Sequence, residues 1–419
     1  MKITRSTVTT PLDLGRFIRE ELPYTVDFYN SRTQLHDDIK SLFEHHLGTR
    51  PDYHIYNIDT GASEGIVAVM SRYYQFMLVA LQKLLADDDA VHHYFKLQDK
   101  KYVDLLLEMA RHTFSQHGYS SALTGRFDIA VDPNTGKVSA VYEFNGDTPC
   151  MLFESVNIQS HIAHTHGFDE ENSWFLEVDP TRFRGKTVGL CCYADSIEDI
   201  INTETLSQVV HEAGGTPVMV DINELHHDAL NKTRPFFLTD NYISPDLIYT
   251  LVPWEEMIVN GYSHFKEWRE WIGNQQFIEP PWRWFMSNKA FMAWMTHLLE
   301  TDQEFAEYRD LPHVPTYIKP QFDDNYVIKP TIGRLSNNIV IVNNGVRTES
   351  PTTLYADSPV VYQKYVAPGK VDNANYIMGV WIGTARRFQD NMASTLAIRE
   401  FDHAILDCQN ERFVPHRLV

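Results

Sequence analysis

Cysteine is scarce in this chain, and its positions are irregular. Only four of the 419 residues are cysteine: Cys150, Cys191, Cys192 and Cys408. Their number and spacing fit neither a disulfide framework nor a zinc site. Because chains without a disulfide framework are typical of a reducing compartment, we expect a cytoplasmic protein.

Long apolar runs are also missing. No stretch approaches the roughly 18 apolar residues that a membrane helix needs. The first residues, MKITRSTVTTPLDLGRF, lack the apolar segment of a secretion signal. We therefore expect no membrane partner.

Positive charge is in deficit, with 36 basic residues against 56 acidic ones and a net charge of −20. This balance makes nucleic acid an unlikely general partner. It is compatible with a cationic substrate such as a polyamine, although solubility alone explains it equally well. The length allows two or three domains, and a hydrophobic content of 43% is enough for a large core. No sequence feature indicates an oligomeric state.

The glycine-rich nucleotide fingerprints are absent too. Residues 186–193, 217–221 and 247–252 have the composition of buried strands, and residues 199–213 form an amphipathic pattern closed by glycine. Strand–helix–strand order predicts a parallel sheet with a crossover. Without G-x-G-x-x-G, this unit is not predicted to bind a dinucleotide.

Helical patterns dominate the first part of the chain. Residues 14–22 and 35–47 predict modest helices, and residues 63–118 carry aromatic, Met and Leu side chains at helical spacing. We expect these side chains to form core. A helix is also expected over residues 151–163. His161, His164 and His166 in and after it could bind a metal, but exposed or packed histidines are the simpler interpretation.

The most informative stretch begins at Gly125 and predicts a β-hairpin. Phe127, Ile129 and Val131 alternate with less apolar residues, which is a period of two. Residues 132–136, DPNTG, have turn chemistry. If Val131 lies opposite Val138, then Arg126 lies opposite Glu143, because opposed residues share a face.

Four polar side chains, Arg126, Asp128, Glu143 and Asn145, should then meet on one side of this hairpin. Two carboxylates and an amide oxygen are ligands that Mg²⁺ accepts alongside substrate phosphates. An adjacent Arg can hold a phosphate or a developing oxyanion. The alternative is a solvated charged face, although the turn-forming exit at residues 145–149 suits the rim of a site.

Two lysine segments follow later in the chain. Residues 287–290, SNKA, open an apolar helix, which places Lys289 in its first turn. A cation is unfavourable there because it opposes the helix dipole, so its presence suits a site where an anion binds. Residues 326–330 predict a strand that contains Lys329. The small-residue turn after it could wrap a polyphosphate through backbone N–H groups, though it is not a Walker loop. A surface lysine and a plain hairpin are the respective alternatives.

These motifs together resemble the glutathionylspermidine synthase family. The matching segments, in chain order, are RFD, YEFNGDTP, EPPW with SNKA, VIKPTIGR, VVYQKY, GVWIG, IRE and FVPH, scattered from about residue 126 to the end. The resemblance implies an α+β chain with an ATP-grasp fold, a preceding α/β lobe and an N-terminal helical region. The implied divisions are residues 1–120, 121–175, 176–275 and 276–419, with the second and fourth forming the ATP-grasp core.

The resemblance also implies a function, namely joining a small-molecule carboxylate to an amine with ATP and Mg²⁺ through an acyl phosphate. Asp128, Glu143 and Asn145 match the metal ligands. Arg126 matches a residue that steadies the reacting intermediate, and Arg399 a late phosphate-contacting arginine. The positions that match nucleotide-binding residues are Lys289, Lys329, Gly333, Arg334, Gln363 and Lys364, with Gln363 at the adenine hinge.

The sequence departs from the family pattern at three places. Gly146 stands where Ala is usual, the segment RLSNN from Arg334 replaces the more common REGAN, and Cys150 lies near positions that contact the acceptor peptide in relatives. Nucleotide use is therefore better supported than substrate identity. Ligation of another acid and amine, a non-catalytic Mg·ATP-binding protein, and a plain kinase or ATPase stay open as alternatives.

Overall fold

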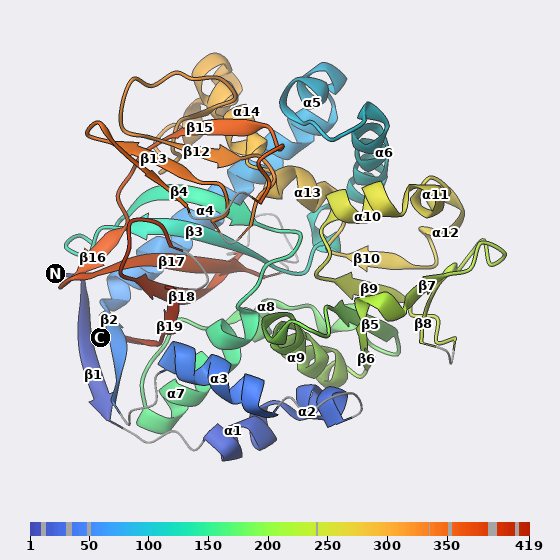
Figure 1. The fold of residues 1–419 in the computed structure, drawn as a ribbon, viewed down its shortest axis with the longest axis horizontal. Helices are drawn as coiled ribbons and strands as arrows, with labels where there is room; N and C mark the ends of the chain where they lie inside the picture. Colours follow the sequence, from blue (N-terminus) through green and yellow to red (C-terminus); the bar gives the residue numbers. More distant parts are fainter. Residues whose placement is uncertain are drawn as a thin grey trace.

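The computed structural model mixes helices and strands along the whole chain, so the protein is α+β (Figure 1). The structure describes residues 1–9, 14–30, 36–47, 52–239, 242–334, 336–350, 354–383, 392–406 and 410–419. Three of the positions discussed above lie outside these ranges, namely Cys408, Leu335 and the first residue of the helix predicted over 35–47.

The predicted hairpin belongs to a six-stranded antiparallel sheet with the order β19-β18-β17-β3-β4, in which β16 also pairs with β17. Every residue of β3 is buried, because the sheet is covered on both faces. The strands are β3 (Gly125–Val131), β4 (Val138–Asn145), β16 (Gly369–Val371), β17 (Ala374–Ile382), β18 (Ala393–Phe401) and β19 (Arg412–Val414).

The register of the hairpin differs from the predicted one away from the turn. Val131 lies opposite Val138, as expected, but Arg126 lies opposite Asn145 and not opposite Glu143. The prediction of an Arg126–Glu143 pair is therefore wrong. It assumed uninterrupted alternation along both strands.

Two β-bulges cause this difference. Ser139 and Tyr142 are extra residues of β4 with no partner in the ladder, so Asp128 lies directly opposite Glu143. An offset of one residue between the strands would turn the side chains of β4 to the other face of the sheet. The two bulges together give an offset of two residues, which keeps these side chains on the original face. The bulges therefore bring the two carboxylates into direct opposition without burying either in the core.

The predicted Lys329 strand lies in a five-stranded antiparallel sheet with the order β11-β15-β12-β13-β14. The strand predicted over 339–342 is confirmed with a shift of one residue, and a further strand follows it after Gly345, whose φ of 74° suits the turn. The strands are β11 (Thr316–Tyr317), β12 (Tyr326–Pro330), β13 (Val340–Asn343), β14 (Val346–Glu349) and β15 (Val360–Lys364).

The predicted parallel sheet is confirmed, with the order β10-β9-β5-β6 and parallel pairing throughout. Its crossover helix α9 (Ile197–Glu212) begins after Ser196, whose hydroxyl accepts the Asp199 N–H, and is followed by Gly214 at φ 80°. The strands are β5 (Thr187–Cys192), β6 (Thr216–Asp221), β9 (Leu247–Thr250) and β10 (Gln276–Ile278). A small hairpin, β7 (Leu225–His227) and β8 (Phe236–Leu238), projects beside it (Figure 1).

The N-terminal region contains a sheet that the sequence did not predict. β1 (Ile3–Thr9) and β2 (Asp52–Ile58) pair antiparallel, and β2 pairs in parallel with β20 (His416–Leu418). The two ends of the chain therefore lie on the same side of the molecule (Figure 1). The helices between these strands are α1 (Leu14–Glu21), α2 (Pro23–Asn30) and α3 (His36–Leu47).

The expected helical segments form much of the core. Their Met and aromatic side chains, such as Met70, Tyr73, Tyr74 and Met77, are buried. Within the described ranges, no helix is both long and apolar enough to span a bilayer. The helices are α4 (Thr60–Leu85), α5 (Asp88–Tyr94), α6 (Lys100–His117), α8 (Trp174–Glu177), α10 (Trp254–Asn260), α11 (Tyr262–Phe265), α12 (Trp268–Trp271), α13 (Trp282–Ser287) and α14 (Ala290–Thr301).

The helix predicted over 151–163 appears as a π-helical turn (Glu154–Ile158) followed by α7 (Gln159–His166). His166 lies 2.7 Å from the Tyr53 hydroxyl, and His161 lies 3.3 Å from the Glu21 carboxylate. Across the described part of the chain, no three His, Cys, Asp or Glu side chains are grouped to hold a metal ion. These two histidines therefore contact other side chains of the protein.

Candidate active site

One cavity of about 500 Å³ is bordered by the six-stranded sheet, the five-stranded sheet and the carboxyl edge of the parallel sheet. It is lined by every residue predicted to have a catalytic, nucleotide-binding or metal-binding role, although these residues come from seven separate strands, loops and helix ends. They are Arg126, Asp128, Glu143, Asn145, Lys289, Lys329, Gly333, Arg334, Gln363, Lys364 and Arg399.

Asp128 lies at the centre of the polar contacts. Its carboxylate is 2.9 Å from Arg126 Nε and 2.6 Å from a terminal guanidinium nitrogen of Arg399, and Asn145 Nδ2 lies at 3.5 Å. Burial alone would raise the pKa of Asp128, but the two arginines lower it to about 2. The carboxylate is therefore an anion under all ordinary conditions.

Both arginines are fixed by second partners. Arg126 donates to the Cys150 carbonyl at 2.5 Å, and its guanidinium stacks near the Trp381 ring. Arg399 pairs with Glu411 at 3.1 Å. Such fixed guanidinium groups are preorganised donors for an oxyanion that develops beside them.

Glu143 connects the hairpin to the first lysine segment. Its carboxylate lies 3.3 Å from Lys289 Nζ, which also donates to the Gly333 carbonyl at 2.9 Å. Burial opposes ionisation of Glu143, but Lys289 and Lys329 keep its pKa below the usual value. Lys289 directly precedes α14, one residue before the first turn in which it was predicted, and contacts both the hairpin and the turn after β12.

Lys329 differs from Lys289, because its ammonium group has no hydrogen-bond or ion-pair partner among the residues that the structure describes. The side chain is buried, with Nζ 5.7 Å from the centre of the Tyr142 ring. Burial lowers its pKa to about 8 even though Glu143 opposes the shift. A buried, unpaired ammonium at a cavity wall is suited to receive an anion.

The remaining predicted residues border the same space. The Gln363 amide nitrogen donates to the Tyr142 carbonyl and to Thr316 Oγ1, both at 3.2 Å, and so joins β15 to β4. Lys364 is exposed at the rim. Arg334 is paired with Glu255 at 2.8 Å.

An acidic wall, which the sequence analysis did not single out, faces the arginines. It consists of Glu198, Asp199 and Glu411, which all line the cavity. Burial and the neighbouring Glu198 raise the pKa of Asp199 to about 6, and burial followed by Glu411 raises that of Glu198. The sequence contained a signal for Glu198 and Asp199, because both follow a predicted parallel strand and ligands bind at the carboxyl edge of a parallel sheet. Glu411 had none.

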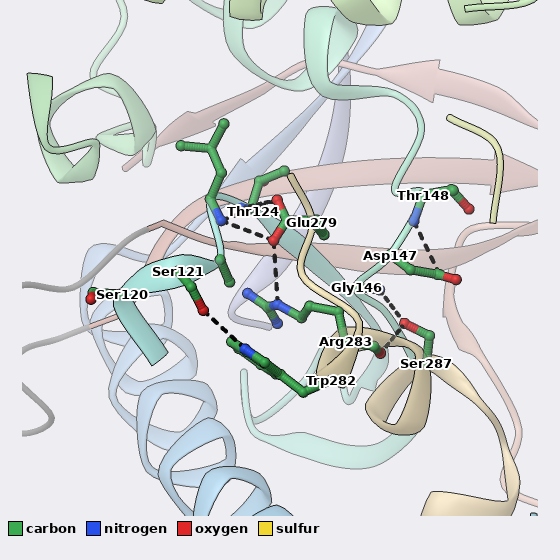
Figure 2. Close-up of polar contacts among 12 residues, drawn as sticks. Ser120, Ser121, Thr124, Gly146, Asp147, Thr148, Glu279, Trp282, Arg283 and Ser287 are labelled. Carbon is green, nitrogen blue, oxygen red and sulfur yellow. Dashed lines mark hydrogen bonds and ion pairs between the residues drawn. The ribbon is translucent and has the colours of Figure 1, made fainter. Parts of the chain in front are cut away.

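The segment before Lys289 holds both ends of the hairpin (Figure 2). Glu279 accepts the backbone N–H groups of Leu123 and Thr124, which lead into β3, at 2.9 Å. Ser287 Oγ accepts the Gly146 N–H, just after β4, at 2.9 Å. The loop that carries Lys289 is thereby fixed relative to Asp128 and Glu143.

Cys150 also borders the cavity and is half-buried. Burial, followed by the charge of Asp199, raises the pKa of its thiol, so the thiol stays protonated. Its backbone carbonyl, and not its sulfur, makes the contact with Arg126.

The chain is similar to known proteins over most of its length. The family described as glutathionylspermidine synthase preATP-grasp matches residues 51–419. A protein of Haemophilus influenzae, provisionally named an acid–amine ligase, is 28% identical over 322 residues, which cover 71% of this chain and 75% of that protein.

Two solved structures are similar at a greater distance. A glutathione synthetase-like effector from Globodera pallida has a TM-score of 0.46 and 11% identity, with 87% of this chain and 89% of that chain covered. A provisionally named γ-glutamylcysteine synthetase from Methylobacillus flagellatus has a TM-score of 0.34 and 11% identity, with 80% and 84% covered.

Proposed function

Because the chain belongs to the glutathionylspermidine synthase family, we propose that it is an ATP-dependent ligase of the ATP-grasp type that joins a carboxylate to an amine. The observation that carries the proposal is the meeting of Asp128 and Glu143 with Lys289 and Lys329 in one cavity. We assign residues 121–175 and 276–419 to the ATP-grasp core, residues 176–275 to the substrate lobe and residues 1–120 to a mostly helical N-terminal region.

Asp128, Glu143 and Asn145 are the proposed Mg²⁺ ligands. The donor set fits the ion, because two ionised carboxylates and an amide oxygen are the hard oxygen ligands that Mg²⁺ prefers. The lowered pKa values of Asp128 and Glu143 support this assignment, since both groups are available as anions. Mg·ATP would supply its γ-phosphoryl group to the substrate carboxylate with release of ADP. The amine would then attack the acyl phosphate, and phosphate and a proton would leave as the amide bond forms.

The side chains of this protein then have distinct tasks. Lys289 and Lys329 balance the charge of the phosphates. The turn containing Gly333 and Arg334 lies over these phosphates. Gln363 and Lys364 border the place proposed for adenine. Arg126 and Arg399 stabilise the oxyanion at the reacting carboxyl carbon, and they need no reorganisation because Asp128, Cys150 and Glu411 already orient them.

The acidic wall supports an amine substrate with more than one ammonium group. Glu198, Asp199 and Glu411 line the same cavity as the two arginines, and Glu411 contacts Arg399, so we place the amine between this wall and the activated carboxyl group. Glu411 is already paired with Arg399, but a polyamine would complement Glu198 and Asp199 at once, whereas a neutral or anionic acceptor would not. The acid is proposed to be a peptide carboxylate or a related small molecule.

The test is a coupled assay of ADP release with panels of peptide acids and polyamines in the presence of Mg²⁺, with products identified by mass spectrometry. The expected result is ADP release that needs both an acid and an amine, with an amide product of matching mass. ADP release without amide would indicate a kinase or ATPase. Binding of Mg·ATP without turnover on any pair would indicate a non-catalytic protein.

A further inference from the structure

Arg334 lies in the turn after β12, and its guanidinium contacts two other parts of the chain. One terminal nitrogen lies 2.8 Å from the Glu255 carboxylate in α10, and Nε donates to the Thr148 hydroxyl at 3.3 Å. The second terminal nitrogen lies 3.6 Å from Asp147 Oδ2. The turn is thereby linked to α10 and to the segment that leaves β4.

Asp147 lies between this arginine and α13. Its side chain is buried, and Oδ1 accepts the Thr148 N–H at 3.0 Å. The Ser287 hydroxyl, which accepts the Gly146 N–H, also contacts the Asp147 carboxylate. Figure 2 shows Gly146, Asp147 and Thr148 beside Ser287 at the end of α13. Asp147 is therefore held from the hairpin side and presents its other oxygen to Arg334.

The surroundings of Asp147 give that second oxygen no other task. A small cavity of about 40 Å³ is lined by Asp147, Glu255, Asn288, Lys289 and Arg334, among others. Asp147 Oδ2 and Glu255 Oε2 have no hydrogen-bond partner among the described residues. A buried carboxylate without compensation is costly, so the Arg334 charge is what retains both acids in this place.

We propose that Asp147 is a positioning residue which, together with Glu255, clasps Arg334 and so fixes the turn at residues 331–334 over the proposed phosphate site. The proposal rests on the proposed function. Lys289 Nζ holds the same turn through the Gly333 carbonyl from the other side. With the clasp intact, the turn is preorganised before nucleotide binds, and with the clasp broken, binding has to order it.

The test is Asp147→Asn, which keeps the size of the side chain and an acceptor for the Thr148 N–H but removes the charge. Losing a charge-assisted contact of this kind should weaken the affinity for Mg·ATP about tenfold, measured by calorimetry, and raise its KM more than it lowers kcat. Asp310→Asn is the matched control, because Asp310 forms a surface ion pair with Arg72 at 2.7 Å. It should change neither quantity.

A double-mutant cycle separates the clasp from a general loss of structure. In an Arg334→Gln background, Asp147→Asn should have no further effect on Mg·ATP affinity. Glu255→Gln breaks the clasp from the α10 side and should reproduce the loss if Asp147→Asn proves unstable in thermal unfolding. Equal penalties for Asp147→Asn in both backgrounds, or wild-type affinity in both acid variants, would overturn the clasp alone. A wild-type protein that does not bind Mg·ATP would overturn the proposed function and the clasp with it.

Discussion

Arg399 and Asp128 form an ion pair of 2.6 Å across β17, although their own strands, β18 and β3, are not neighbours in the sheet. The strand between them carries Gly379 opposite Asp128. A Cβ at Gly379 would lie 3.1 Å from Arg126 Cδ. The absence of a side chain at this position leaves room for the Arg126 side chain, whose guanidinium contacts the carboxylate.

Gly379→Ala tests this arrangement. The added methyl group should displace Arg126 by a few tenths of an ångström and lower kcat by about tenfold or more, since a misplaced oxyanion donor loses most of its effect. The affinity for Mg·ATP, measured by calorimetry, should change little. Gly65→Ala is the control, because an added Cβ there meets nothing within 4 Å. Unchanged turnover in Gly379→Ala would contradict the role given to Arg126.

Glu143→Gln should abolish most Mg²⁺-dependent ADP release. The variant keeps the shape of the side chain but removes a charge that the metal and Lys289 both use, and we expect a loss on the order of 10²-fold or more. The measurement is ADP release against Mg²⁺ concentration, with the unfolding midpoint as a check of the fold. Glu108→Gln, at a surface ion pair with Arg269, should behave as wild type. Full activity in Glu143→Gln would remove the metal assignment.

Lys329 should make nucleotide binding sensitive to alkaline pH. Burial lowers its pKa to about 8, so the free side chain is charged below that pH and neutral above it. Affinity for Mg·ATP should therefore fall as the pH rises from 7 to 9.5, and a bound nucleotide should move the midpoint upward. In Lys329→Gln the affinity should be weak and independent of pH over this range. A wild-type dissociation constant that stays constant between these pH values would contradict the prediction.

Glu154 should make the stability of the protein decrease toward alkaline pH. Burial raises its pKa from 4.5 to about 8, so between these values the folded protein binds a proton that the unfolded chain has released. The free energy of unfolding should then fall by about 1.4 kcal/mol per pH unit in this range. Glu154→Gln should remove this contribution. Urea unfolding of both proteins at pH 6 and pH 8 measures how much more the wild-type free energy of unfolding depends on pH. The titration of the neighbouring His46 contributes to both proteins and is removed by the comparison. Parallel pH dependences would exclude the effect.

The acidic wall should determine how tightly the amine substrate binds. Asp199→Asn should raise the KM for a polyamine about tenfold, because one buried charge contact is lost, and should affect a monoamine less. The KM for Mg·ATP should not change, since Asp199 lies in the lobe that we propose for the substrate and not among the proposed nucleotide-binding residues. Steady-state kinetics with a polyamine and a monoamine of similar length provide the comparison. An equal change for both amines would show that the wall does not recognise charge.

The sequence predicted those parts of the structure that depend on neighbours in the chain. The hairpin, the parallel sheet and the β12 strand each carry a local period and a local turn, so their existence was predictable. The sheet of β1, β2 and β20 was missed, because β2 pairs with β20 from the other end of the chain, three helices separate β1 from β2, and β1 is mostly polar. Local patterns contain no information on such pairing.

The candidate site shows the same limit at the level of single residues. Asp128, Glu143 and the two lysines could be named because they lie in short motifs. The acidic wall, the Arg334 clasp and the Gly379 gap could not, since each depends on which distant elements face the cavity. The bulges were also unpredictable, because alternation on β4 looks regular and only the pairing with β3 reveals the extra residues.

The bulge at Tyr142 has a consequence for anyone who wishes to transplant this hairpin into another scaffold. In a regular strand, adjacent side chains point to opposite faces. Here Tyr142 and Glu143 are consecutive, yet both line the cavity, so the strand offers an aromatic ring for the Lys329 ammonium and a carboxylate in immediate succession. A graft that copied the alternating residues but omitted the unpaired one would keep the carboxylate and lose the ring beneath the lysine.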